Sequence, residues 1–60
     1  MELVKLKIIK KAENPRFVGN NYLGIELDGK VHNTGAINFK LKNYSNWFNI
    51  PKELVEIIRP

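Results

Sequence analysis

Three short segments of this chain alternate apolar and polar residues, and this period of two limits the fold more than any other feature. Residues 3–9 carry valine, leucine and isoleucine on one side and two lysines on the other. Residues 23–28 repeat the pattern, and residues 37–42 show it most regularly. Because alternate side chains of a strand point to opposite faces, each segment is expected to be a half-buried β-strand.

The first segment has a second interpretation, a basic amphipathic helix lying on a membrane. Its apolar positions fit a period of two better than the helical period of about 3.6, so the strand is favoured. No apolar run reaches the roughly 20 residues of a spanning helix. Charges also interrupt the start of the chain, unlike a signal peptide. We therefore expect a cytoplasmic protein without a membrane partner.

Turn-forming residues separate the alternating segments. Residues 10–22 are expected to form a long loop, because proline, glycine and asparagine interrupt them. Asp28-Gly29 predicts a tight turn that ends the second strand. A brief strand at residues 30–32 and a further turn at residues 33–35 follow. The alternative is one long loop over residues 28–35 between two longer strands.

The end of the chain predicts a short helical turn followed by a strand. Pro51 suits the first turn of a helix, so residues 50–54 are expected to form a single helical turn. Residues 55–58 then return to extended structure. The prediction is thus five short strands, the first pairing with the last, and only one helical turn.

The size and composition of the chain exclude several classes of protein. With 60 residues it forms one domain, residues 1–60, whose core is small. It has no cysteine, and its single histidine, His32, has no second ligand for a metal site. Glu26 and Asp28 share a strand face but have no base or metal nearby. We expect no enzymatic activity, no metal and no cofactor.

The predicted order of elements resembles the Src-homology-3-like fold. The ending Trp47–Ile58 (WFNIPKELVEII) is similar to the usual close of that fold, where a proline-bearing turn leads into the final strand. The resemblance covers almost the whole chain. It implies an all-β, small five-stranded barrel with one short helical turn before the last strand. It implies little about function, since one fold serves many activities, and the Ala-Leu-Tyr-Asp-Tyr signature of proline-binding members is absent.

A looser resemblance links the chain to the glycine-rich domains of cytoskeleton-associated proteins. Arg16–Gly19 (RFVG), Leu23–Lys30 (LGIELDGK) and Asn46–Phe48 (NWF) follow the order seen in those domains. Their ligand loop reads Gly-Lys-Asn-Asp-Gly. The corresponding segment here, Gly29–Gly35 (GKVHNTG), keeps Gly-Lys and loses the continuation. This resemblance therefore implies no binding function.

Three aromatic residues are candidates for a binding site. Tyr22, Tyr44 and Trp47 stand among asparagines and a serine in predicted loops, whereas the phenylalanines, Phe39 foremost, are assigned to the core. Tyrosine and tryptophan are frequent anchors of protein docking and of base stacking. These three are predicted to be the partner-binding residues. The competing interpretation makes Trp47 a core plug beneath a loop.

Four lysines form the alternative site. The chain has a net charge of +4. Lys5 and Lys7 are predicted to point outward from the first strand, and Lys40 and Lys42 from a later one. A barrel brings them together as a lysine strip that attracts phosphate backbones, or that is simply a solvated face. The predicted function is a non-enzymatic module that docks on a partner protein, and the alternative is nucleic-acid binding.

Overall fold

The computed structural model describes residues 1–59 as five antiparallel β-strands in one sheet with two short 3₁₀ turns. Pro60, the last residue of the predicted domain, lies outside the described residues. The elements in chain order are β1 (Glu2–Ile8), η1 (Val18–Tyr22), β2 (Glu26–Val31), β3 (Ile37–Lys40), β4 (Trp47–Ile50), η2 (Lys52–Leu54) and β5 (Val55–Ile58). The prediction of an all-β chain with five strands is confirmed in number, but the brief strand predicted at residues 30–32 is wrong, since residues 30 and 31 belong to β2.

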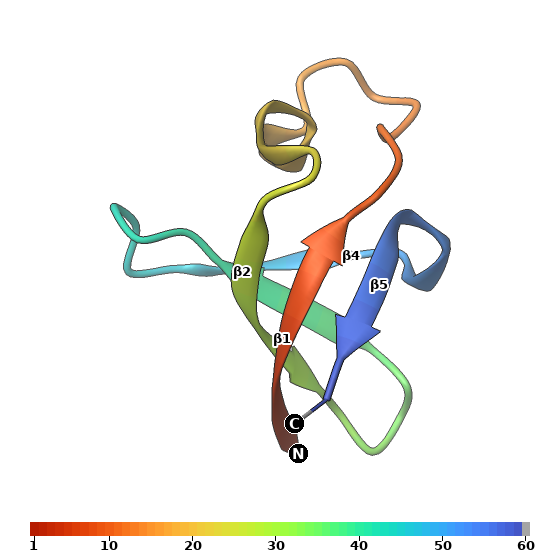
Figure 1. The fold of residues 1–60 in the computed structure, drawn as a ribbon, viewed down its shortest axis with the longest axis vertical. Coiled ribbons are helices and arrows are strands. Elements are labelled where there is room, and N and C mark those ends of the chain that lie inside the picture. The colour runs from red at the N-terminus through yellow and green to blue at the C-terminus, as the bar shows by residue number, and fades with distance from the viewer. Residues whose placement is uncertain (60) are drawn as a thin grey trace.

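The strands lie in the order β4-β3-β2-β1-β5, so the first strand pairs with the last as predicted. Strands β3 and β4 cross behind β1 and β2 in Figure 1, which shows how the sheet coils around its inner face. β4 and β5 are the two edges of the sheet and do not pair with one another. Within residues 1–59 the sheet is therefore not closed by strand pairing.

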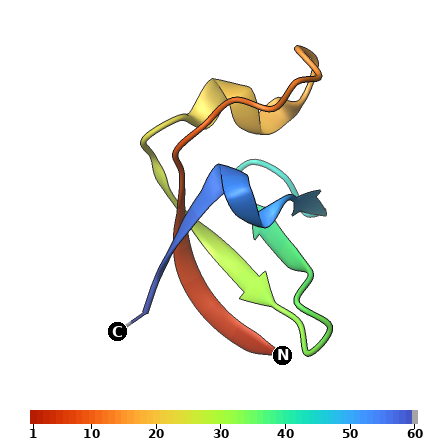
Figure 2. The ribbon, with the colours of Figure 1, turned by 90° about the vertical axis from the view of Figure 1, so that its right-hand side faces the viewer.

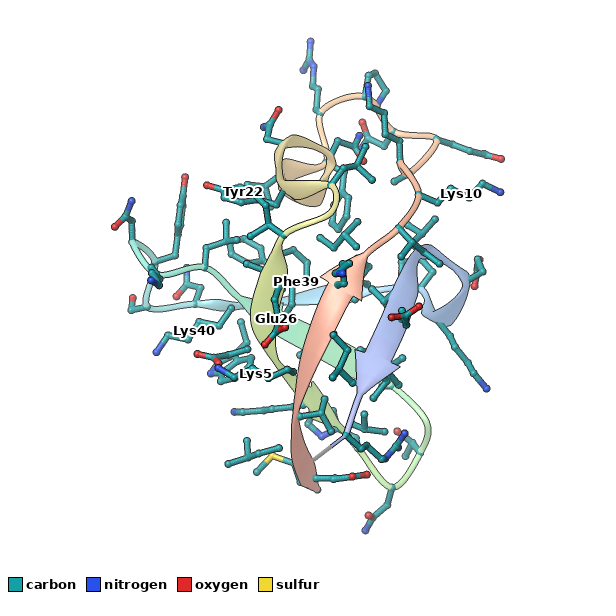
Figure 3. The ribbon with its side chains drawn as sticks, viewed as in Figure 1. Lys5, Lys10, Tyr22, Glu26, Phe39 and Lys40 are labelled. Atoms are coloured by element: carbon teal, nitrogen blue, oxygen red, sulfur yellow. The ribbon has the colours of Figure 1, made fainter. Side chains whose placement is uncertain are left out.

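The core lies on the inner face of the coiled sheet, and Phe39 is at its centre. Phe39, Leu6 and Ile8 are completely buried. The Phe39 ring stacks on Phe48 at 5.4 Å between centroids and meets Phe17 edge-on at 5.9 Å. Figure 3 shows Phe39 in the middle of the molecule. The assignment of the phenylalanines to the core is confirmed, with Phe17 and Phe48 partly buried against it.

The turn predicted at Asp28-Gly29 is wrong, because strand β2 continues through these two residues to Val31. Gly29 lies opposite Phe39 on β3, and a Cβ there would collide with the buried Leu6 side chain. Glycine at position 29 thus leaves room for the Leu6 side chain to lie close to the backbone, and it does not form a turn. The true turn follows β2, where Gly35 has a φ of +90°. The turn predicted at residues 33–35 is confirmed, and the alternative loop over residues 28–35 is wrong.

The long loop between β1 and β2 contains η1, so the prediction of only one helical turn is wrong. Figure 2 shows η1 lying across one end of the sheet. The Asn20 side chain accepts a hydrogen bond from the Ala12 amide at 2.8 Å and donates one to the Asn14 carbonyl at 3.0 Å. Tyr22 packs against the core cluster from this loop. Tertiary contacts of this kind hold a turn that has no side-chain cap of its own.

The segment 23–28 is only partly the predicted strand, since β2 begins at Glu26 and Leu23 and Ile25 are exposed. Strand β4 was not predicted as a strand at all. The helical turn near the end is confirmed as η2, but it is shorter than the predicted residues 50–54, because Ile50 belongs to β4 and Pro51 precedes the turn. Strand β5 follows it as expected. No helix of residues 1–59 has both the length and the apolar character needed to cross a membrane.

Candidate functional site

One row of side chains crosses the outer face of the sheet, the face opposite the core. Directly opposed residues of neighbouring antiparallel strands point to the same face. Register pairs Ile58 with Lys5, Lys5 with Asp28, Asp28 with Lys40, and Lys40 with Trp47. Figure 3 shows Lys5 and Lys40 on the same side of the sheet. Residues from all five strands thus form one continuous surface.

Trp47 is the largest side chain of this row and is half-buried. It is not among the residues that pack against the core cluster, whereas its neighbour Phe48 is. The Lys30 ammonium lies 4.0 Å from the Trp47 ring centroid, and that of Lys40 lies 5.9 Å away. Cation–π contacts of this kind hold the indole in place on the outer face. The competing interpretation of Trp47 as a core plug therefore does not describe its position.

A hollow of about 630 Å³ opens beside Trp47, and we call it the Trp47 hollow. Its walls are mostly apolar. The apolar side chains come from three strands, and one of them, Leu3, is 69% exposed. Its lining includes Leu3, Lys5, Asp28, Lys40, Trp47 and Ile58.

A second hollow of about 410 Å³, the Tyr22 hollow, adjoins the first. Tyr22 and Ile25 from the long loop form one wall, and Lys42 lies at its border. Its walls are more polar than those of the Trp47 hollow. Both hollows share Lys5, Asp28 and Lys40, which form a ridge between them.

Tyr44 occupies neither hollow. Its ring meets Phe48 edge-on at 5.7 Å between centroids, and the residue is 46% exposed. The three predicted aromatic site residues therefore lie in three settings. Trp47 and Tyr22 are in adjoining hollows, and Tyr44 lies against the aromatic border of the core.

The lysine strip is interrupted by carboxylates. Lys5 forms an ion pair with Asp28. Lys7 lies opposite Glu26 on one side and Glu56 on the other. Lys40 and Lys42 have no carboxylate within ion-pair distance among residues 1–59. Each lysine that β1 contributes to the strip therefore has a carboxylate opposite it on a neighbouring strand.

Two ion pairs shift the pKa values of Lys5, Asp28 and Arg59. The hydrogen bond from Lys5 holds the pKa of Asp28 below its ordinary value of 3.8, and the same bond raises the pKa of Lys5. Arg59 donates to both carboxylate oxygens of Glu2, at 2.9 and 3.2 Å, and this contact raises the pKa of Arg59. Lys5 and Asp28 therefore both stay charged near neutral pH and contribute fixed opposite charges to the surface.

The remaining polar residues make no arrangement that suggests a reaction. Glu26 and Asp28 point outward from β2 as predicted, and Asp28 is engaged by Lys5. The His32 Nε2 atom is hydrogen-bonded to Asn38, whose amide donates in turn to Asn49. Within the described part of the chain no three potential metal ligands come together.

Three residues of the site were missed in the sequence: Leu3, Lys30 and Ile58. Lys30 was lost because a turn was placed at Asp28-Gly29. The alternation of inward and outward residues continues through Gly29. Leu27 and Val31 point toward the core, so Lys30 between Gly29 and Val31 points outward. Which residues of distant strands meet Trp47 depends on register, which alternation alone does not determine.

Comparisons with protein-family models, curated proteins and solved structures find no match for this chain. The functional argument consequently rests on the geometry of the outer face. Its main features are an aromatic side chain held away from the core, two adjoining hollows, and lysines of which Lys40 and Lys42 form no ion pair among residues 1–59.

Proposed function

We propose that this protein is a non-enzymatic binding module of the Src-homology-3-like barrel class that docks on a partner protein through Trp47 and the hollow beside it. The proposal rests on one observation. A tryptophan stands on the outer face, away from the core, next to a hollow with mostly apolar walls. Tryptophan is among the residues that most often dominate the energy of protein interfaces.

The barrel class is supported by the order of the elements. Five short antiparallel strands follow one another with the first paired to the last. A long first loop and a 3₁₀ turn directly before the last strand agree with the usual arrangement of that fold. The turn η2 leads the chain from β4 to β5, the two edges that approach one another in such a barrel.

Two features favour a protein partner over a nucleic acid. Carboxylates alternate with lysines on the outer face, so a phosphate backbone along β1 would meet repulsion as well as attraction. The Lys30 ammonium also lies over the Trp47 ring, where a stacking base would need to be, whereas a protein partner can also contact the apolar walls of the hollow beside it. Both features are compatible with a protein surface that has few charges and buries the hollow.

A titration of the isolated partner tests the proposal. The partner is captured from nuclease-treated cell lysate on the immobilised protein, purified, and titrated against the wild type and the Trp47→Ala variant. We expect the variant to lose about 2 kcal/mol or more of binding free energy, which is about 30-fold in Kd. Circular dichroism should show an unchanged fold. The dependence of the affinity on salt should be shallow.

Ile9→Ala is the matched control, because Ile9 is 55% exposed and lines neither hollow. Its affinity should equal that of the wild type. Equal affinities of the wild type and Trp47→Ala would reject the proposal, and so would unfolding of Trp47→Ala. Micromolar binding of single-stranded DNA or RNA that falls steeply with salt, and that Lys40→Ala with Lys42→Ala abolishes, would establish the nucleic-acid alternative instead.

A further inference from the structure

The two hollows lie on either side of one shared ridge, and this arrangement restricts the shape and charge of a partner that fills both. Lys5, Asp28 and Lys40 line both hollows and separate them. The Trp47 hollow has Leu3 in its wall, and the Tyr22 hollow has Ile25. An occupant that fills both hollows must therefore pass over charged groups between two apolar contacts.

The charge left over on the ridge is positive. Lys5 and Asp28 neutralise one another in their ion pair. Lys40 has no carboxylate within ion-pair distance among residues 1–59, and the same holds for Lys42 beside the Tyr22 hollow and Lys30 beside Trp47. An uncharged or basic occupant would leave these ammonium groups without a partner. A carboxylate placed over Lys40 complements them.

We propose that the partner contributes an extended peptide segment that places one apolar side chain in each hollow and a carboxylate on Lys40 between them. The inference rests on the proposed function. In an extended chain the side chains of residues i, i+2 and i+4 point to the same side, about 6 to 7 Å apart from one to the next. The order apolar, acidic, apolar at alternate positions therefore matches the order hollow, ridge, hollow.

A peptide selection tests the order without knowledge of the partner. The protein is used to select from a displayed library of random peptides of about twelve residues, which exceed the 28 Å length of the molecule when extended. We expect enrichment of an aspartate or glutamate flanked by large apolar residues two positions away on each side. Proline-rich or basic consensus sequences, or no consensus, would overturn the inference.

Titrations of one selected peptide then assign each position. Trp47 is the only tryptophan of the chain, so its fluorescence reports binding directly. Replacing either apolar residue of the peptide by alanine should weaken binding about tenfold, and replacing the acidic residue by its amide about three- to fivefold. Equal affinities of the acidic peptide and its amide would overturn the carboxylate assignment.

Variants of the protein complete the test. Ile25→Ser should weaken the full peptide but not the peptide that lacks the matching apolar residue, since the two changes remove one contact. Lys40→Gln should abolish the preference for the acidic peptide. The controls are Ile9→Ser and Lys10→Gln. Figure 3 shows Lys10 on the opposite side of the molecule from Lys40.

The outcomes separate this inference from the proposed function. If Trp47→Ala abolishes partner binding while Ile25→Ser and Lys40→Gln do not affect it, the docking function holds and the two-hollow segment is wrong. If Trp47→Ala has no effect on the partner, both are wrong. A single-stranded oligonucleotide that binds more tightly than the selected peptide and displaces it would also overturn the inference.

Discussion

Strand β3 presents different chemistry to the two faces of the sheet. Ile37 and Phe39 point inward and are 4% and 0% exposed, whereas Asn38 and Lys40 point outward and are only half-buried. The inner face is apolar and close-packed, so any lost atom leaves a cavity. The outer face holds charges and an indole that water reaches. If the protein binds as proposed, stability and recognition are located on opposite faces of the same strands, and substitutions are expected to affect one and spare the other.

The largest effect is expected from Phe39→Ala on the inner face. Phe39 is completely buried and contacts two other rings, so its loss should cost about 3–5 kcal/mol. A chain of this length has a total stability of roughly 3 to 9 kcal/mol. The variant should be largely unfolded by circular dichroism, and Leu41→Ala should approach it. A folded Phe39→Ala as stable as Trp47→Ala would contradict the division between the two faces.

A smaller effect is expected from Gly29→Ala, which adds an atom to the inner face. The new Cβ would lie 3.0 Å from the Cγ of Leu6 and closer still to one of its methyl groups. Leu6 is completely buried and has no free space to move into, so we expect a loss of about 1–3 kcal/mol in urea unfolding.

Leu6→Val provides the control for this prediction because it removes the crowded carbon. The double variant should be less destabilised than the sum of the two single variants. Additive losses would mean that Gly29 is needed for its backbone conformation and not for the approach of Leu6.

How much of the fold could be predicted depended on how cleanly each strand alternates. β1 and β3 have buried apolar residues on one face and mostly polar residues on the other, so they were found, although β3 ends at Lys40 rather than at residue 42. β4 was missed because Trp47 points outward and Phe48 inward, and two adjacent aromatics conceal a period of two. β2 was predicted to end too early because glycine is common both in turns and where a side chain lies close to the backbone. Only the position of the Leu6 side chain beside Gly29 shows that the second case applies.

Several residues of the candidate site were predictable from the sequence, but Leu3, Lys30 and Ile58 were not, and neither was the arrangement. Tryptophan among polar neighbours correctly indicated partial exposure of Trp47, and alternation correctly placed Lys5 and Lys40 outward. The positions of Asp28 between these lysines and of Lys30 over the indole follow from strand register. Register depends on pairing between segments far apart in the chain, and a local pattern does not contain it.

The smallest effect is expected from Asp28→Asn, which tests whether the outer face contributes to stability at all. Asp28 and Lys5 have side chains that are 62% and 57% exposed, so water screens their attraction. The folded pKa of Asp28 lies below its ordinary value, which is that of the unfolded chain. The unfolded chain thus takes up the proton first as the pH falls.

The stabilisation from Asp28 is consequently complete above about pH 4 and is lost as the pH falls through the lower folded value. Wild type should slightly exceed Asp28→Asn in melting temperature at neutral pH, and the two should converge in acid. Added salt should reduce the difference at neutral pH. Glu26→Gln on the same strand face, which forms no ion pair among residues 1–59, controls for the general effect of removing a negative charge. A difference in melting temperature that persists unchanged in acid would mean that the introduced amide disturbs the strand itself. The ridge between the two hollows would then contribute to stability as well as to the proposed recognition.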